Sequence, residues 1–518
     1  MAWLKRTDRR FLEALSSLTI CNPFLPERLE LERQALGNDF DETESVWSRL
    51  ADVDGSRANV TQLTKRTAAL ATRLQKQLTE GAEADECELG LYEDLVLYSL
   101  YDRFRADFQK IIEESHGSPN RSRRVTIWPD FLKRFEHFLK ISGRSFPGQH
   151  EPAHMFAGFF QLRRAFYHIY HFIVGRSMPT ARLRAAVWQS IFTHDLRRYR
   201  RTLFERMGDI TTLISGPSGT GKELVARAIG FSRYIPFDVQ NQRFSEDFVS
   251  AFYALNISAL SPTVIESELF GHCLGAFTGA VSDREGWLEV CRPLGTVFLD
   301  EIGELDAGIQ VKLLRVLQTR SFQRLGESAE RRFQGKIIAA TNCDLMTEIR
   351  EGRFREDFYY RLCSDMITTP SLQDQLADSP DDLGTLLRFL ARRVAGEESD
   401  ELAVEVEAWV NNHLSRDYTW PGNIRELEQC VRNVMIRREY HPPVSKLRLD
   451  NNDPQHQLLE SIEQASLTAD DLLRHYCTLV YAKLGSYEQT AKRLGLDRRT
   501  VKSKIDEALL DELKNDEK

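Results

Sequence analysis

Apolar side chains recur at the spacing of helical turns through the first 180 residues of the chain. Three such stripes are found, at 97–108, 131–139 and 155–173. Residues three or four positions apart lie on one face of a helix, so each stripe predicts a helix with one buried face. We therefore predict an all-α domain over 1–180, with polar surface loops at 116–124 and 142–154.

The pattern changes near residue 210, where short β-branched runs begin to alternate with helical stretches. The runs are TTLIS (211–215), TVFLD (296–300) and KIIAAT (336–341). This alternation is typical of a parallel α/β sheet, which we place over 181–383. Beyond it the strands stop. Three further parts are expected: a helical lid at 384–440, a polar linker at 441–465 and a small helical domain at 466–518.

The composition is that of an ordinary globular protein. Of 518 residues, 42% are hydrophobic, and 69 Lys and Arg against 77 Asp and Glu leave a net charge of −8. A generally basic nucleic-acid coat is therefore excluded, and any DNA contact has to come from a local patch. No apolar run approaches the roughly 20 residues that a membrane span needs, so we expect a cytoplasmic protein with no membrane segment.

Eight cysteines are scattered through the chain, with no CxxC pair and no spacing typical of metal ligands. This distribution fits a reducing compartment better than a disulfide framework. Because buried free cysteine usually behaves as a small hydrophobe, we interpret all eight as core residues.

A glycine-rich loop joins the run TTLIS to a helical stretch. With the start of that helix it comprises Gly216, Pro217, Ser218, Gly219, Thr220, Gly221, Lys222, Glu223 and Leu224. Such a loop lets backbone amides turn toward phosphates, and Lys222 can reach the phosphate oxygens. A loop that merely turns a corner is the alternative, but the placement of the lysine favours a nucleotide site. Glu223 stands where Ser or Thr usually holds magnesium, so another residue has to hold the ion.

Two adjacent acids, Asp300 and Glu301, end the apolar run TVFLD. Hydrolysis of a nucleoside triphosphate requires a carboxylate that holds a metal ion beside one that activates water. We assign Asp300 to Mg²⁺ and Glu301 to the attacking water. Paired acids could also be a solvated strand edge or a helix cap, but the phosphate loop upstream makes that alternative weaker.

Several segments resemble the sigma-54-dependent transcriptional activators of bacteria, which are AAA+ ATPases. They are ELFGHCLGAFTGA (268–280), GTVFLDEIGEL (295–305), LLRVLQTRSFQRLG (313–326), GRFREDFYYRL (352–362) and WPGNIRELEQ (420–429). The resemblance covers about half of the chain and implies an AAA+ P-loop core with an α-helical lid. It also implies a homo-oligomeric ring, usually a hexamer, with ATP between subunits. Hydrolysis would drive the GAFTGA loops against the sigma-54 RNA polymerase holoenzyme to open promoter DNA.

The same resemblance implies roles for five further residues. Asn256 would hold the water-activating carboxylate until the γ-phosphate is sensed, and Asn342 would be the first sensor. Arg355 and Arg361 would reach the ATP of a neighbouring subunit, where a guanidinium stabilises developing phosphoryl charge. Arg425 would be the second sensor, on the lid. A lone arginine on a helix is more often solvated, so these roles rest on the motifs around them.

The contact with sigma-54 would be made by Gly275, Ala276, Phe277, Thr278, Gly279 and Ala280. A tight turn around a buried Phe277 is the alternative. The chain departs from the family pattern where Cys273 and Leu274 replace a charged pair before this loop, and where Pro217 replaces a Glu. The segment VWQSIF (187–192) occupies the place expected for an Ile-Gly-x-Ser motif on the adenine side and lacks its Gly.

The C-terminal unit has the spacing of a helix-turn-helix, with Gly495 in the turn. Its last helix carries Arg498, Arg499, Thr500, Lys502 and Lys504. The first three, at the start of the helix, would face base edges in a major groove, and the two lysines would hold phosphates. The unit resembles the Fis-type DNA-binding domain, so we expect it to bind upstream enhancer DNA. A small helical hairpin with a solvated basic face is the alternative.

The first 180 residues do not reveal which signal they sense. Four histidines allow a metal or haem hypothesis: His150, His154, His168 and His171. We favour packing or capping for those in the aromatic stretch FFQLRRAFYHIYHF. Three arginines allow an anion-binding hypothesis, for which a solvated loop is the favoured alternative: Arg121, Arg123 and Arg124.

The sequence thus predicts a sigma-54-dependent regulator that binds DNA and hydrolyses ATP. A DNA-binding AAA+ repressor, or an AAA+ remodeller that does not act on sigma-54, stays open as the alternative. The intact GAFTGA segment and the complete acid pair favour the activator.

Overall fold

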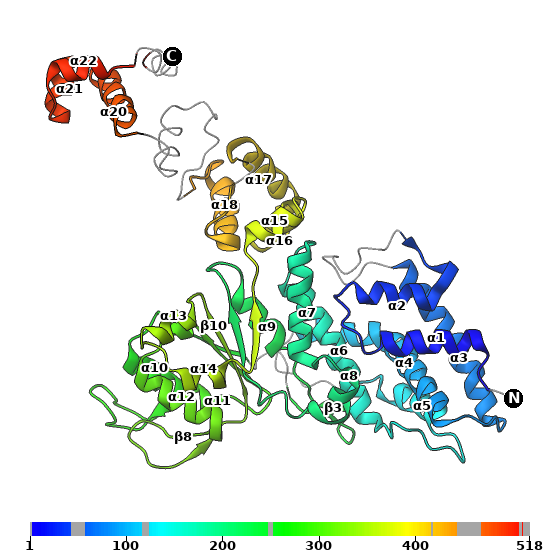
Figure 1. The fold of residues 1–518 in the computed structure, drawn as a ribbon. Helices are drawn as coiled ribbons and strands as arrows, with labels where there is room; N and C mark the ends of the chain where they lie inside the picture. The colour runs from blue at the N-terminus through cyan, green and yellow to red at the C-terminus, as the bar shows by residue number, and fades with distance from the viewer. Residues whose placement is uncertain are drawn as a thin grey trace. The chain divides into compact units, whose positions relative to one another are not determined.

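The computed structural model describes residues 3–42, 57–116, 124–246, 252–415, 418–442, 468–506 and 510. Contacts divide the chain into two compact units. The first comprises Met1–Glu407 and Thr419–Arg438, and the second comprises Ala408–Tyr418 and Glu439–Lys518. Figure 1 shows the N-terminal helices in blue and the sheet in green within the first unit.

The N-terminal part of the first unit is all helical, as predicted. Its helices are α1 (Arg6–Leu18), α2 (Glu27–Leu36), η1 (Gly37–Asp39), α3 (Ala58–Thr79), α4 (Glu86–His116), α5 (Trp128–Leu139) and α6 (Pro152–Phe172). The loop predicted at 142–154 ends earlier, because Pro152 begins α6 at a position where a missing amide costs no hydrogen bond. Most of the loop predicted at 116–124 lies outside the described residues.

Aromatic side chains fill the core of these helices. Phe104, Phe108, Phe131 and Phe156 are each at most 1% exposed. The rings of Phe131 and Phe156 lie 4.9 Å apart in an edge-to-face arrangement. Burial of one such side chain stabilises a fold by about 1.5–3 kcal/mol. The predicted apolar stripes are therefore the faces that hold the helices together.

A five-stranded parallel sheet follows, in the order β11-β1-β10-β7-β4. Its strands are β1 (Thr212–Ser215), β4 (Phe252–Asn256), β7 (Thr296–Asp300), β10 (Lys336–Thr341) and β11 (Asp365–Thr368). Along β10, Ile337 and Ala339 join one apolar cluster, whereas Ile338 and Ala340 join another. Both faces of the sheet are therefore buried, which explains the unbroken apolar runs in the sequence.

Helices and short hairpins surround this sheet. The helices are α7 (Met178–Phe192), α8 (Leu196–Arg198), η4 (Tyr199–Leu203), α9 (Lys222–Gly230), α10 (Pro262–Phe270), α11 (Trp287–Val290), η5 (Ile302–Glu304), α12 (Ala307–Thr319), α13 (Leu345–Arg350) and α14 (Glu356–Leu362). The hairpins pair β2 (Phe237–Asp238) with β3 (Arg243–Phe244), β5 (Gly271–His272) with β6 (Arg284–Glu285), and β8 (Ser321–Phe322) with β9 (Arg331–Arg332).

The β2–β3 hairpin joins the core of the N-terminal helices, a contact that the sequence did not predict. Phe237 and Phe244 belong to the same apolar cluster as the helical aromatics. Phe244 stacks on Phe160 with ring centroids 4.0 Å apart, and the ring of Phe237 lies 4.9 Å from that of Trp128. The helical domain and the α/β core thus share one hydrophobic core through this hairpin.

The lid and the C-terminal helices complete the chain. The first unit holds α15 (Leu372–Asp378), α16 (Asp382–Ala395), η6 (Gly396–Glu398) and α18 (Asn423–Arg437), while α17 (Ser399–His413) crosses from it into the second unit. The second unit also holds α20 (Ala469–Leu484), α21 (Tyr487–Leu494) and α22 (Arg498–Lys504). From residue 443 on, the predicted linker lies outside the described residues. Within the described ranges, no helix is both long and apolar enough to cross a membrane.

All eight cysteines are free thiols. Cys291, Cys430 and Cys477 are buried, as predicted, but Cys87 in α4 is exposed and the remaining four are half-buried. The prediction that all eight are core residues is therefore wrong. A single cysteine carries no periodic signal of its own, so the sequence does not say which face of a helix it occupies.

The N-terminal histidines pack as the sequence favoured. His168 is buried, with its ring 5.4 Å from that of Phe231. The two ring nitrogens of His154 lie 2.7 Å from the Tyr234 hydroxyl and 2.7 Å from a backbone carbonyl oxygen. Among the arginines considered for anion binding, Arg124 donates to the side-chain oxygen of Gln242 at 2.9 Å, and the two at 121 and 123 lie outside the described residues.

Candidate functional site

The glycine-rich loop runs from the end of β1 to the start of α9 at Lys222. Gly216, Gly219 and Gly221 have φ angles of 145°, 78° and 87°. Residues with a side chain rarely adopt such angles, so glycine is what allows the loop to fold back here. The Nζ atom of Lys222 donates to the carbonyl oxygens of Gly216 at 3.0 Å and Pro217 at 3.2 Å. The lysine therefore lies across the mouth of the loop.

Two acids at the end of β7 lie within electrostatic reach of this lysine. Burial raises the pKa of Asp300, and the charge of Glu301 raises it further. Burial likewise lowers the pKa of Lys222, and the charges of Glu301 and Asp300 oppose that shift. One cation and two carboxylates thus share a half-buried region, an arrangement that is frequent in functional sites.

The Glu301 carboxylate reaches the neighbouring strand. The backbone amide of Asn342, at the end of β10, donates to Glu301 Oε2 at 3.2 Å. Asn256, the last residue of β4, lies in register with Asp300, and its side-chain oxygen accepts a hydrogen bond from Ser258 at 2.8 Å. Asn256, Glu301 and Asn342 therefore lie at the carboxyl edge of three adjacent strands, the edge where α/β proteins bind ligands.

The lid helix α18 begins directly against the phosphate loop. Asn423 Nδ2 donates to the Ser218 carbonyl oxygen at 2.9 Å, and Arg425 Nη1 donates to the Ser218 hydroxyl at 3.1 Å. A Cβ atom on Gly219 would lie 2.2 Å from the carbonyl oxygen of Gly422. The second predicted sensor, Arg425, is therefore placed at the loop. Asn423 was missed by sequence reasoning, because its partner is 205 positions away.

A small cavity beside the loop corrects one prediction. It is lined by Ile173 and Val174 just before α7, by Thr220 and Leu224, and by Ile424 of the lid. The segment 187–192 lies instead at the end of α7, inside the apolar core.

A Val-Gly-x-Ser segment adjoins this cavity and lies earlier in the chain, at Val174-Gly175-Arg176-Ser177. This Val-Gly-x-Ser pattern was visible in the sequence, but with Val in place of the expected Ile. The carboxylate of Asp382, in the lid helix α16, accepts backbone amide hydrogen bonds from Arg176 at 2.5 Å and Ser177 at 2.8 Å. These bonds tie the segment to the lid.

The remaining predicted residues of the nucleotide site are on the surface. Arg355 precedes α14 and donates to Asp357 at 3.0 Å and 2.8 Å, and Arg361 is exposed near the end of that helix. Glu223 accepts two hydrogen bonds from Arg227, one turn later on α9. Neither arginine lies among the charged groups that act on Lys222.

The donor set fits a nucleoside triphosphate with a divalent cation. Three glycines at positive φ shape the loop, and the Lys222 ammonium supplies positive charge at its mouth. Asp300 and Glu301 provide the hard oxygen ligands that Mg²⁺ prefers, while Glu223 is held by its helix neighbour. The residue that would hold the ion is therefore Asp300 at the end of β7, with Glu301 beside it.

The GAFTGA segment forms a loop between β5 and β6. Its ends are joined by a hydrogen bond from the Gly275 amide to the Ala280 carbonyl oxygen at 2.9 Å. Gly275 and Gly279 have φ angles of 79° and 104°. Thr278 is exposed, and Phe277 is half-buried, with its ring 5.0 Å from that of His272. The alternative of a fully buried phenylalanine is therefore wrong.

In the second unit, α21 and α22 are joined by a turn in which Gly495 has a φ of 66°. Asp497 caps α22 by accepting the Arg499 amide at 2.8 Å, and Val501 is fully buried beneath it. Arg498, Arg499 and Lys502 are exposed, and Thr500 is half-buried. Lys504 is the exception to the predicted basic surface, since its ammonium is bonded to Asp470 of α20.

Comparisons with known proteins match the α/β core and the lid. The family model described as the sigma-54 interaction domain matches residues 192–368, and the AAA+ ATPase lid domain matches 378–451. The chain is 40% identical over 301 residues to the Nif-specific regulatory protein of Azotobacter vinelandii, which covers 57% of this chain and 53% of that protein. It therefore spans about half the length of that relative.

A second relative is covered more fully. Over 310 residues the chain is 38% identical to the sigma54-dependent transcriptional regulator SfnR of Pseudomonas fluorescens, which covers 58% of this chain and 74% of that protein. Among solved structures, NtrX of Brucella abortus aligns with 74% of this chain and 79% of its own at 23% identity and a TM-score of 0.40. Because both domain families match adjacent parts of the chain and most of SfnR is covered, the chain belongs to the sigma-54-dependent transcriptional regulators.

Proposed function

We propose that this regulator hydrolyses ATP in a ring of subunits and uses the energy to convert the sigma-54 RNA polymerase closed complex into the open complex. One observation carries the proposal. Lys222, Asp300 and Glu301 converge beside the phosphate loop, while Thr278 stands exposed on a separate loop of the same domain. In this proposal, one domain carries both the residues that hydrolyse ATP and the exposed loop that contacts sigma-54.

In this proposal the loop and Lys222 bind the phosphates of ATP, and Asp300 holds Mg²⁺. The ion would supply charge neutralisation at the phosphate oxygens. Glu301 takes a proton from the attacking water. The backbone amide of Asn342 donates to the Glu301 carboxylate and orients that group. Asn256 lies at the end of the neighbouring strand, in register with Asp300.

The arginines are proposed to act at two places. Arg425 already contacts the loop residue Ser218, so it would report the state of the nucleotide to the lid. Arg355 and Arg361 are exposed and would reach the ATP of the next subunit in the ring, usually a hexamer in this family. A guanidinium brought to the transferring phosphoryl group can raise the rate by about 10³–10⁵.

DNA binding is proposed for the C-terminal unit. The exposed Arg498 and Arg499 at the start of α22 would contact bases, and Lys502 would contact a phosphate. Because the Lys504 ammonium is bonded to Asp470, we expect Lys504 to contribute less to DNA binding than Lys502. This unit would hold the ring at upstream enhancer sites.

Thr278→Ala tests the link between the two activities. ATPase activity should stay within about twofold of wild type, whereas open-complex formation on a sigma-54 promoter should be lost. Ser282→Ala, an exposed hydroxyl just beyond the loop, is the matched control and should keep both activities. Unchanged open-complex formation by Thr278→Ala would favour the alternative of a repressor, or of a remodeller that does not act on sigma-54.

A further inference from the structure

A cavity of about 170 Å³ lies in the first unit, where the N-terminal helices meet the start of the ATPase core. Its wall includes residues of α1, α4 and α6, together with Trp188 of α7 and Arg200 of η4. Engineered cavities of about 150 Å³ are large enough to admit benzene. The space therefore suits a ligand with a single ring.

Flat apolar side chains make up much of the wall. They include Tyr101, Phe159, Phe166, Tyr170 and Trp188. Phe159, Tyr170 and Trp188 are each less than 9% exposed. Aromatic walls favour a planar apolar ligand through stacked and edge-to-face contacts. On this evidence alone, however, the cavity could equally accept a neutral ring.

The charged residues of the wall favour an anionic ligand over a neutral one. Five arginines line the cavity, Arg28, Arg57, Arg105, Arg163 and Arg200. Within the described part of the chain, the lining includes one carboxylate, Asp102, which lies 3.7 Å from Arg105. The buried Glu32 behind the wall accepts from Arg28 at 2.8 Å. Among the described lining residues, five guanidinium groups therefore accompany one carboxylate.

Arg200 has a buried guanidinium donor, its Nε atom, without a hydrogen-bond partner among the described residues. Burial lowers the pKa of this guanidinium, an effect that the charge of Asp94 opposes and that of Arg197 reinforces. A buried donor without a partner is costly, and a carboxylate ligand would satisfy it with a charge-assisted hydrogen bond.

We propose that this cavity is an effector site for a small organic anion that carries a carboxylate on a flat apolar ring. The ring would occupy the aromatic wall, and the carboxylate would face the arginines, with Arg200 as its main partner. This binding does not depend on ATP hydrolysis or on sigma-54, so it goes beyond the function proposed above.

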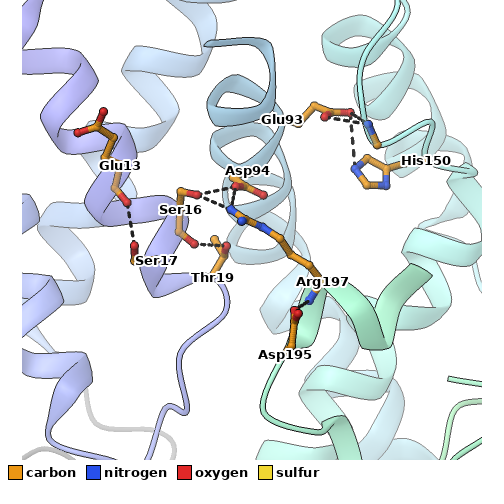
Figure 2. Close-up of polar contacts among 10 residues, drawn as sticks. Glu13, Ser16, Ser17, Thr19, Glu93, Asp94, His150, Asp195 and Arg197 are labelled. Atoms are coloured by element: carbon orange, nitrogen blue, oxygen red, sulfur yellow. Dashed lines mark hydrogen bonds and ion pairs between the residues drawn. The ribbon is translucent and has the colours of Figure 1, made fainter. Parts of the chain in front are cut away.

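The cavity is connected to the ATPase core by hydrogen bonds. Thr19, in the cavity wall, donates to the Ser16 carbonyl oxygen at 2.7 Å, and the Ser16 hydroxyl donates to Asp94 at 2.7 Å. Asp94 in turn pairs with Arg197, in the segment that leads to β1 (Figure 2). Arg200 belongs to the same segment. A bound ligand would therefore act on the residues directly before the ATPase sheet.

The test uses the full chain with benzoate as the probe and benzamide as its neutral counterpart. Benzoate should change tryptophan emission saturably and raise the Tm by about 2–4 °C near saturation. The emission change should be lost in Trp188→Phe, while the rise in Tm remains. Benzamide should bind at least about tenfold more weakly, because it cannot form the charge-assisted bond.

Matched variants separate the site from general effects on folding. Arg200→Gln should weaken benzoate binding at least about tenfold, whereas Arg201→Gln, the exposed next residue, should not. Leu162→Phe should fill part of the cavity and block the ligand. If no saturable response to benzoate occurs, if benzamide binds equally well, or if Arg200→Gln binds as wild type does, the proposal is wrong. An inactive ATPase would leave all of these readouts intact.

Discussion

Arg197 and Asp94 form an ion pair, with 2.5 Å between Nη2 and Oδ2, that fastens the segment before the ATPase sheet to helix α4 of the N-terminal domain. Asp94 is almost buried, and the hydroxyl of Ser16 contacts both charged groups (Figure 2). The ion pair is thus one of the contacts that join the helical domain to the segment preceding the ATPase sheet.

Arg197→Gln tests this ion pair. The variant leaves the Asp94 carboxylate buried without its cation, which should cost about 1–3 kcal/mol, at the low end because the arginine is 41% exposed. The measurement is the Tm of the full chain. Arg198→Gln, an exposed neighbour in the same short helix, should leave the Tm unchanged. Equal effects of the two variants would contradict a specific role for the pair.

Glu301→Gln tests the proposed catalytic carboxylate. ATP turnover should fall at least about 10²-fold, because an amide cannot take the proton of the attacking water. ATP binding should stay within about threefold, since the loop and Lys222 are unchanged. Turnover and nucleotide binding are measured separately. Glu304→Gln, an exposed acid in the adjacent turn, should turn over normally. Equal loss of binding and turnover in Glu301→Gln would refute the assigned role.

Gly219→Ala tests the contact between the lid and the loop. The new methyl group would lie 2.2 Å from the Gly422 carbonyl oxygen, so the lid has to move away from Ser218. We expect ATP affinity to fall at least about tenfold. Gly352→Ala is the matched control, because that glycine has a similar φ of 74° and open space around it, so it carries the backbone strain without the clash. If both variants bind ATP alike, the contact is unimportant.

Lys336→Met tests a buried charge at the start of strand β10. Burial lowers the pKa of Lys336 from 10.5 to about 7, although Asp365 partly opposes this. Between these values the unfolded chain binds the proton more tightly, so the lysine destabilises the fold fully below about pH 7 and progressively less as the pH rises toward 10.5.

The advantage of Lys336→Met in Tm over wild type should therefore shrink between pH 7 and pH 9, after allowance for its lost hydrogen bond to the Ile210 carbonyl oxygen. Lys312→Met, with a half-exposed side chain, is measured in parallel as a control. A difference that stays constant with pH would show that the buried ammonium carries no such cost.

Deletion of residues 1–180 should expose the β2–β3 hairpin. Phe237 and Phe244 then lose the aromatic partners that bury them, so the shortened chain should aggregate at lower concentration than the full chain. Replacing both with Ser should restore solubility, which light scattering can follow. A shortened chain that stays monodisperse with both phenylalanines would show that the hairpin finds cover elsewhere.

The sequence by itself determined the local features of this protein. The helical stripes, the phosphate loop at 216–221 and the acids at 300–301 each depend on residues close together in the chain, and backbone geometry then fixes their shape. The family motifs added roles that the spacing alone did not supply. The adenine-side segment was misplaced although Val174 and Gly175 were visible, because a four-residue pattern with one substitution has little weight outside its structural context.

Only the tertiary structure decided which distant residues meet. The pairing of Asn423 with Ser218, the insertion of Phe244 among the N-terminal aromatics and the arginine-lined cavity join positions far apart in the sequence. An apolar stripe predicts that a helix face is buried, but not which element packs against it. The surroundings of an arginine side chain likewise cannot be predicted until the packing of the chain is known. Which distant residues meet depends on the complementary surfaces of whole helices and strands, because apolar burial and hydrogen bonding are satisfied only in the folded chain.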